Sequence, residues 1–284
     1  MRETHPQSIL GRKAARLRRE TGNLDLESKL DRHLSPHQIL LASFIRPMKL
    51  LIFSPIVLIL SIYVALVYGL LYLLFTTFST VFEGQYGFST GISGLAYLGI
   101  GVGELVGLFV FGVLSDRILK AKMAADNLTR PKPEYRLILM IWFAPIIPVG
   151  LFIYGWTAYY KVHWFMPIFG TFFVGYGSFF VVVSTRPSIK PPMELTYVTL
   201  QMPSQLYLVD LFGSEAAASA LGANILLRSL AGTFLPLAGP HMYSKLNYGW
   251  GNTLLGFLAL AFIPAPILFY KHGQWLREKT PVKL

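Results

Sequence analysis

Two ionisable side chains, Glu104 and Arg228, lie deep inside long apolar stretches of this 284-residue chain. A charge at the centre of a lipid-embedded helix costs roughly 2.5–3.5 kcal/mol on insertion scales, so such a group normally faces a cavity or a partner. Because the two charges have opposite signs, they could form an ion pair. The alternative is that Glu104 binds a proton or a cation, and the residue types favour neither interpretation.

Three polar side chains accompany these charges in the apolar stretches. Asn224 precedes Arg228 by four residues and therefore lies on the same helix face. Tyr68 and Tyr72 are also four residues apart, and this face could line a cavity or equally contact lipid or protein core.

The pattern of reactive residues argues against an enzyme. The chain has no cysteine and six histidines that follow no metal-ligand spacing, and it contains no glycine-rich phosphate-binding loop. We therefore expect no cofactor, no metal site and no catalytic residues.

Six apolar stretches must position the polar side chains. Hydrophobic residues make up 54% of the chain and charged residues 14%, against about 25% charged in a typical soluble domain. A helix needs about 20 apolar residues to cross a bilayer, whereas barrel strands are about 10 residues long and alternate apolar with polar. The sequence therefore predicts an all-α polytopic membrane protein whose six transmembrane helices are Leu50–Phe82, Gly91–Leu114, Leu137–Tyr160, Trp164–Val183, Ala216–Gly239 and Tyr248–Tyr270.

The basic residues are distributed asymmetrically between the two sides of these stretches. Of the 25 Lys and Arg residues, 22 fall in the two termini and in the second and fourth connections. Because basic segments stay in the cytoplasm, we expect both termini and these loops to be cytoplasmic. The net charge of +11 then reflects membrane orientation, so we expect lipid and not nucleic acid as a partner.

This orientation divides the chain into three parts: a basic cytoplasmic segment (1–49), a six-helix bundle (50–270) and a cytoplasmic tail (271–284). Five bases lie among residues 9–20, ILGRKAARLRRE. They favour a solvated cytosolic helix over one lying along the anionic leaflet, because the apolar face is thin.

Several segments, taken in order, resemble fungal transporters of the major facilitator superfamily, in the twelve-span drug:proton antiporter family. The similar stretches are ETHPQSILGRKAARLRRETGN, RPMKLLIFSPIVLILSIYVALVYGLLYL, SGLAYLGIGVG, PEYRL, PVGLFIYGWTA, VHWFMPIFG, QLYLVDLF, AASALGANILLRSL and GWGNTLL. The family resemblance includes Arg228 but not Glu104, where an apolar residue is expected.

The resemblance implies that the chain is the C-terminal half of such a transporter, with the first six spans preceding Met1. The intact protein would export small organic molecules, such as drugs, toxins, polyamines or secondary metabolites, in exchange for protons. Family members bind substrate between two six-span bundles, so a missing N-terminal half or a second copy becomes an expected partner. The resemblance also implies an integral membrane location, with the plasma membrane favoured. The alternatives are a non-transporting truncated remnant and a membrane scaffold.

The resemblance also draws attention to the cytoplasmic ends of two spans. Residues 112–117, GVLSDR, are similar to part of the superfamily loop motif G-x-L-x-D-R-x-G-R-K, which locks the two bundles together. This similarity implies gate roles for Gly112, Asp116 and Arg117. Asp210, in YLVD, is expected to lie at the same end and to accept contacts from Arg117 or from the next helix.

A further segment, Val183–Gln201, interrupts the fourth apolar stretch. Its prolines cannot lie in a continuous helix, and its removal would restore a family-like span. Its ends can be encoded by splice-donor and splice-acceptor sequences, so we favour a retained intron over a genuine cytoplasmic insertion.

Overall fold

The computed structural model describes residues 6–22, 36–127, 132–182 and 203–279, and the regular elements in these ranges are helices. Four helices within them are long and apolar enough to cross a membrane: Pro55–Tyr86, Thr90–Ala125, Leu137–Tyr159 and Ala218–Gly273. The last has 56 residues, which suffices for two crossings. The predicted all-α membrane class is confirmed, although length alone identifies four spanning helices and not six.

Two parts of the chain are compact by themselves, residues 1–45 and residues 46–284. The first contains α1 (Pro6–Thr21) and the beginning of α2 (Pro36–Phe53). Helix α1 exposes most of its side chains, and Arg16 Nε lies 2.6 Å from Glu20 Oε1 one turn later. An exposed i,i+4 pair of this kind contributes only a few tenths of a kcal/mol to helix stability.

The first spanning helix begins at Pro55, later than the predicted start at Leu50. Ser54 has extended backbone angles and ends α2, and its hydroxyl accepts a hydrogen bond from the amide of Val57 at 3.5 Å. Pro55 follows in the first turn of α3 (Pro55–Tyr86), where a missing N–H costs nothing. Residues 50–53 therefore belong to α2, because a Ser-Pro cap divides the apolar stretch.

The next three stretches form helices whose bounds also differ from the predicted ones. Helix α4 (Thr90–Ser93) and a 3-10 turn, η1 (Gly94–Ala96), lead into α5 (Tyr97–Ala125), which continues well beyond Leu114. A second 3-10 turn, η2 (Pro133–Arg136), precedes α6 (Leu137–Phe143), α7 (Ile146–Tyr159) and α8 (Phe165–Val182). The proposed insertion at 183–201 lies outside the described residues.

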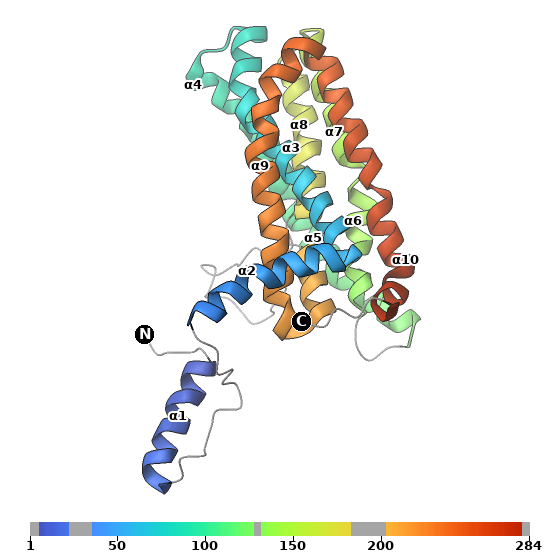
Figure 1. The fold of residues 1–284 in the computed structure, drawn as a ribbon. Helices are drawn as coiled ribbons and strands as arrows, with labels where there is room; N and C mark the ends of the chain where they lie inside the picture. Colours follow the sequence, from blue (N-terminus) through green and yellow to red (C-terminus); the bar gives the residue numbers. More distant parts are fainter. Residues whose placement is uncertain (1–5, 23–35, 128–131, 183–202, 280–284) are drawn as a thin grey trace. The chain divides into compact units, whose positions relative to one another are not determined.

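The fifth and sixth stretches form one helical element, α9 (Pro203–Phe262), which folds back on itself. Asn247 has φ of +58°, and the Tyr243 hydroxyl donates to Asn252 Oδ1 at 3.2 Å. Nine residues of straight helix would separate these two residues by about 13.5 Å. The chain therefore reverses at Asn247 (Figure 1), and α10 (Pro264–Lys279) continues the returning arm beyond the predicted boundary at Tyr270.

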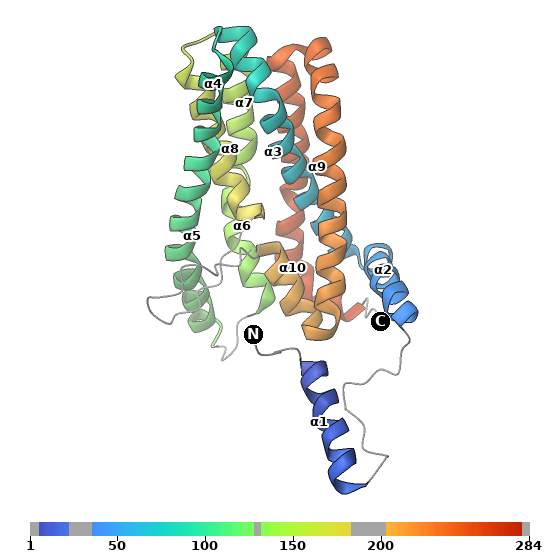
Figure 2. The ribbon, with the colours of Figure 1, turned by 90° about the vertical axis from the view of Figure 1, so that its left-hand side faces the viewer.

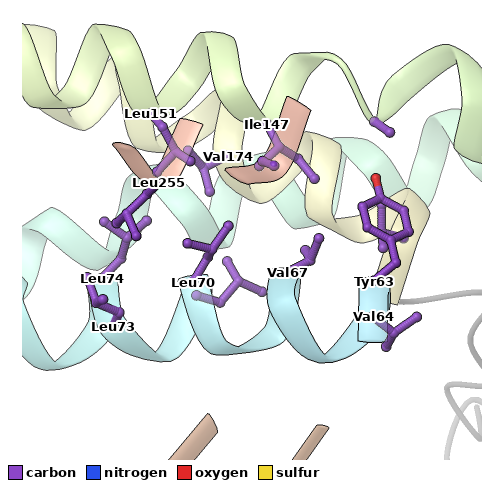
Figure 3. Close-up of a cluster of buried hydrophobic side chains, with 14 of the residues drawn as sticks. Tyr63, Val64, Val67, Leu70, Leu73, Leu74, Ile147, Leu151, Val174 and Leu255 are labelled. Carbon is purple, nitrogen blue, oxygen red and sulfur yellow. The ribbon is translucent and has the colours of Figure 1, made fainter. Parts of the chain in front are cut away.

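Helix α3 is the centre of the bundle. It is 67% buried over its most apolar window, compared with 28% for the helix that contains α5. Figure 3 shows Val67, Leu70 and Leu74 of α3 pointing towards Ile147 and Leu151 of α7 and towards Leu255 of α9. This buried cluster fixes α3 against α7 and α9, so its remaining polar side chains can point in few directions.

Helix α8 packs closely on α5 through the glycines Gly99, Gly103 and Gly107. A methyl group added at Gly103 would meet the carbonyl oxygen of Phe172 and lie 2.8 Å from the backbone nitrogen of Tyr176. A small-residue face of this kind lets the two helix backbones approach closely. Gly101, on the same helix, has open space around it.

We predict that Gly103→Ala lowers the free energy of unfolding by about 1–3 kcal/mol, because the new methyl group must displace the backbone of α8. Gly101→Ala is the matched control and should raise stability by up to about 1 kcal/mol through helix propensity. Unfolding of both variants in detergent tests this. Equal effects at the two positions would contradict the packing described above.

Candidate functional site

Polar residues meet along the contact between α3 and the first arm of α9. Asn224 is fully buried, and its Nδ2 donates to the buried Ser61 hydroxyl at 3.4 Å. Farther along, a methyl group added at Gly239 would lie 3.3 Å from side-chain atoms of Leu73 and Thr77. Because the residue numbers rise together on both helices, the two helices run parallel, as two spans with an odd number of crossings between them must.

Arg228 lies over an aromatic ring in the same contact. Its guanidinium carbon is 4.7 Å from the centroid of Tyr68. The Tyr68 hydroxyl donates to the Tyr72 hydroxyl at 2.9 Å, and Gly232 lets the Tyr68 ring lie against α9. The sequence-predicted residues Asn224, Arg228, Tyr68 and Tyr72 are therefore brought together.

The aromatic contacts continue from this group to α5. The Tyr72 and Phe75 ring centroids are 6.0 Å apart, and those of Phe75 and Tyr97 are 5.9 Å apart. The Tyr97 hydroxyl donates to the Phe75 carbonyl oxygen at 2.7 Å, which ties α5 to α3. Tyr72 and Tyr97 are 39% and 37% exposed, so this connected row forms part of the surface of the bundle.

Glu104 lies elsewhere on the bundle. It is half-buried on α5, and Figure 2 shows α5 and α9 on opposite sides. Of the two interpretations of these charges, the ion pair is not formed here: Glu104 and Arg228 are both among the described residues, and no salt bridge joins them. The physical reason is packing, because the glycine face of α5 is bound to α8 and not to α9.

Glu104 is nevertheless at the same level along the bundle as Tyr68. Helices α3 and α5 run antiparallel, since Ser93 donates to Glu83 and Tyr97 contacts Phe75. Seven residues separate Phe75 from Tyr68, and seven separate Tyr97 from Glu104. Each separation is about 10.5 Å of helix, so Glu104 is level with the ring beneath Arg228.

The residues of the expected gate are helical and are not in a loop. Gly112 and Arg117 are exposed on α5, and Asp116 is half-buried there. The predicted loop therefore begins later, because the helix continues to Ala125. Asp210 lies in α9, but its side chain is outside the described residues, so the contact expected with Arg117 stays a prediction.

Sequence reasoning missed Ser61 and Tyr97, although each has a local signal. Ser61 precedes Tyr68 by seven residues and Tyr97 precedes Glu104 by seven, which are two helical turns.

A further contact, at the end of α5, has no such signal in the sequence. The Tyr135 hydroxyl donates to the Asp126 carboxylate, which raises the pKa of Tyr135 to about 12 and keeps the end of α5 attached to η2.

The chain matches fungal transporters over its whole length. It is 54% identical over 283 residues to the MFS-type transporter mpsC of Macrophomina phaseolina, 52% over 284 residues to the MFS transporter eqxG of Fusarium heterosporum, and 49% over 277 residues to the MFS-type transporter penM of Penicillium rubens. The relatives are MFS transporters and not enzymes. MFS here denotes the major facilitator superfamily.

These matches cover 99%, 100% and 98% of this chain. In the other direction, the chain spans about half the length of the curated relatives it matches, 51%, 54% and 50% respectively. No family model matches the chain, and no solved structure matches it. Together with the apolar helices, the relatives identify an integral membrane protein.

We predict a measurable coupling between Tyr68 and Arg228. A guanidinium placed over an aromatic face contributes about 0.5–2 kcal/mol to stability, so removing either partner should remove this same contribution from the free energy of unfolding. A double-mutant cycle with Tyr68→Leu and Arg228→Gln, read as free energies of unfolding in detergent, measures it. Tyr68→Phe keeps the ring and should retain most of the coupling. Additive effects of the two substitutions would show that the contact contributes nothing.

Proposed function

We propose that this chain is the C-terminal six-span half of a major facilitator transporter, of the drug:proton antiporter kind, that exports small organic molecules. Drugs, toxins, polyamines and secondary metabolites fall within this class. The observation that carries the proposal is the placement of Arg228 over Tyr68, at a helix contact inside an apolar bundle. Whole-length similarity to MFS transporters adds independent support.

The α3–α9 contact has the chemistry of a substrate path. Asn224 Oδ1 is buried and has no hydrogen-bond partner among the residues that the structure describes. A buried acceptor without a donor costs about 1–3 kcal/mol, which a substrate donor or a water molecule entering beside Arg228 would recover. Tyr72 and Tyr97 add exposed aromatic faces, which suit flat or apolar organic molecules.

Glu104 is the proposed proton-coupling residue. It is half-buried in a spanning helix, level with Tyr68 and remote from Arg228, and an intramembrane carboxylate of this kind is by default functional. Separation from Arg228 supports this role, because a carboxylate that is not held by a fixed cation can take up and release protons. The substrate and the proton would then act on different helices at one depth.

The basic segments support a membrane protein with both termini in the cytoplasm, and the resemblance to fungal exporters favours the plasma membrane. In this orientation, Gly112, Asp116 and Arg117 lie at the cytoplasmic end of α5, where a gate between two bundles would close. The partner across that gate would be an N-terminal six-span half or a second copy of this chain.

A chimera tests the proposal: the segment of Macrophomina phaseolina mpsC that matches this chain is replaced by the chain itself. In yeast or in vesicles, the chimera should export a fluorescent drug such as rhodamine 6G, or another member of a panel of drugs, faster as the outer side is acidified. Glu104→Gln should abolish the acceleration by the proton gradient and leave slow, pH-independent export.

Glu83→Gln is the matched control, because Glu83 is a half-buried acid near the end of α3 and lies outside the proposed path. It should leave the pH dependence unchanged. A chimera that reaches the membrane but exports no member of the panel, while intact mpsC does, would contradict transport by this half. Unchanged coupling in Glu104→Gln would remove only the proposed role of Glu104.

A further inference from the structure

Helix α2 exposes large apolar side chains although it is not one of the candidate spanning helices. Met48 and Ile52, one turn apart, are 46% and 69% exposed. The same spacing continues back along α2 to Phe44 and Leu41, which are also exposed. Side chains at intervals of three and four residues share one helix face, so these four form an apolar stripe.

The opposite face of α2 is packed on the bundle. Leu50 and Leu51 are buried in the main core cluster, and a methyl group added at Gly222 in α9 would lie 3.5 Å from the Pro47 side chain. The break at Ser54 then changes the direction of the chain, and Figure 1 shows the last turns of α2 crosswise to α3. Residues 46–53 are therefore held across the end of a spanning helix, with Met48 and Ile52 facing away from the bundle.

The length of α3 places this end at the membrane interface. Its 32 residues extend over about 48 Å, which exceeds the ~30 Å hydrocarbon core and is close to the ~40–45 Å thickness of a bilayer with its headgroups. Both ends of α3 must therefore reach headgroup level. Met48 and Ile52 come just before Ser54, so they lie where headgroups meet acyl chains.

Basic residues border the stripe. At about 100° per residue, Lys49 and Arg46 lie successively along one edge of the face that contains Met48 and Ile52. Their long side chains can cover apolar surface while their charges reach water or phosphate groups. An apolar stripe edged by bases matches an anionic membrane surface better than an apolar protein surface, which would leave the two charges without counter-ions.

We infer that α2 is an in-plane helix that binds anionic phospholipid. Met48 and Ile52 enter the acyl chains, and Arg46 and Lys49 contact the phosphate headgroups. This binding anchors the entry to the first spanning helix, and it does not depend on whether the chain transports anything.

The absence of cysteine makes the test direct, because one introduced cysteine gives one labelling site. The full chain is reconstituted in nanodiscs of phosphatidylcholine with phosphatidylserine and carries a nitroxide at Ile52→Cys. Collision rates with oxygen, which enters lipid, and with a water-soluble nickel chelate report the surroundings of the label. Phe109→Cys, on the exposed face of α5, is the lipid reference, and Lys120→Cys is the water reference.

The Ile52 label should resemble the lipid reference, with collisions dominated by oxygen. Collisions dominated by the nickel chelate would show that the stripe faces water. Shielding from both reagents would show that protein covers it. Either result overturns the inference.

Lipid selectivity is measured separately, as retention of phosphatidylserine relative to phosphatidylcholine on the purified chain by native mass spectrometry. In the double variant Arg46→Gln, Lys49→Gln, this preference should fall about fivefold for each base removed. Lys120→Gln, Lys122→Gln removes the same charge from the exposed end of α5 and should leave the preference unchanged. Equal losses in the two double variants would show a non-specific charge effect and would contradict a site on α2.

Discussion

The parallel contact between α3 and α9 determines where the polar groups of the bundle can lie. In lipid, a polar group must find its partner within the protein, because the surrounding hydrocarbon offers none. Here the Ser61 hydroxyl accepts a hydrogen bond from Asn224. Arg228, one turn after Asn224 on the same face of α9, lies over the Tyr68 ring. The apolar core around α3 keeps these contacts in register, since α3 also packs on α7 and on the returning arm of α9.

The second constraint is the close approach of α5 to α8. Three glycines on α5 bring the two backbones together, so this face of α5 cannot also turn towards α9. As a result, the bundle carries its two intramembrane charges at one level but on opposite sides. An arrangement that paired them in one salt bridge would hold the Glu104 carboxylate against a fixed cation and hinder its exchange of protons. Separation of the charges is therefore what makes a coupled mechanism physically reasonable.

Hydropathy predicted the all-α membrane class correctly, because lipid imposes length and composition on each helix. The ends of the helices were less predictable. The apolar stretch beginning at Leu50 predicts one helix, although the Ser54–Pro55 cap divides it. Helix α5 continues through Asp116 and Arg117, because no helix-breaking residue follows Leu114 there. Asn224, Arg228, Tyr68 and Tyr72 were predicted from spacing on single helices, and the structure brings them together. The sequence could not decide whether Glu104 and Arg228 form a pair, since periodicity shows which face a residue occupies but not which helix that face meets.

In the proposed transporter, the row from Arg228 through Tyr72 to Tyr97 borders a hydrated path and not lipid. Tyr72 and Ile59 provide a matched pair on α3: they are 39% and 38% exposed, and at about 100° per residue they lie on nearly opposite faces. The most direct measurement is the reaction of a water-soluble maleimide with Tyr72→Cys and with Ile59→Cys in the membrane-embedded mpsC chimera. We predict rapid labelling at Tyr72→Cys and little at Ile59→Cys, although position 59 is nearer the end of the helix. Equal labelling, or faster labelling at position 59, would contradict a water-filled path along this face.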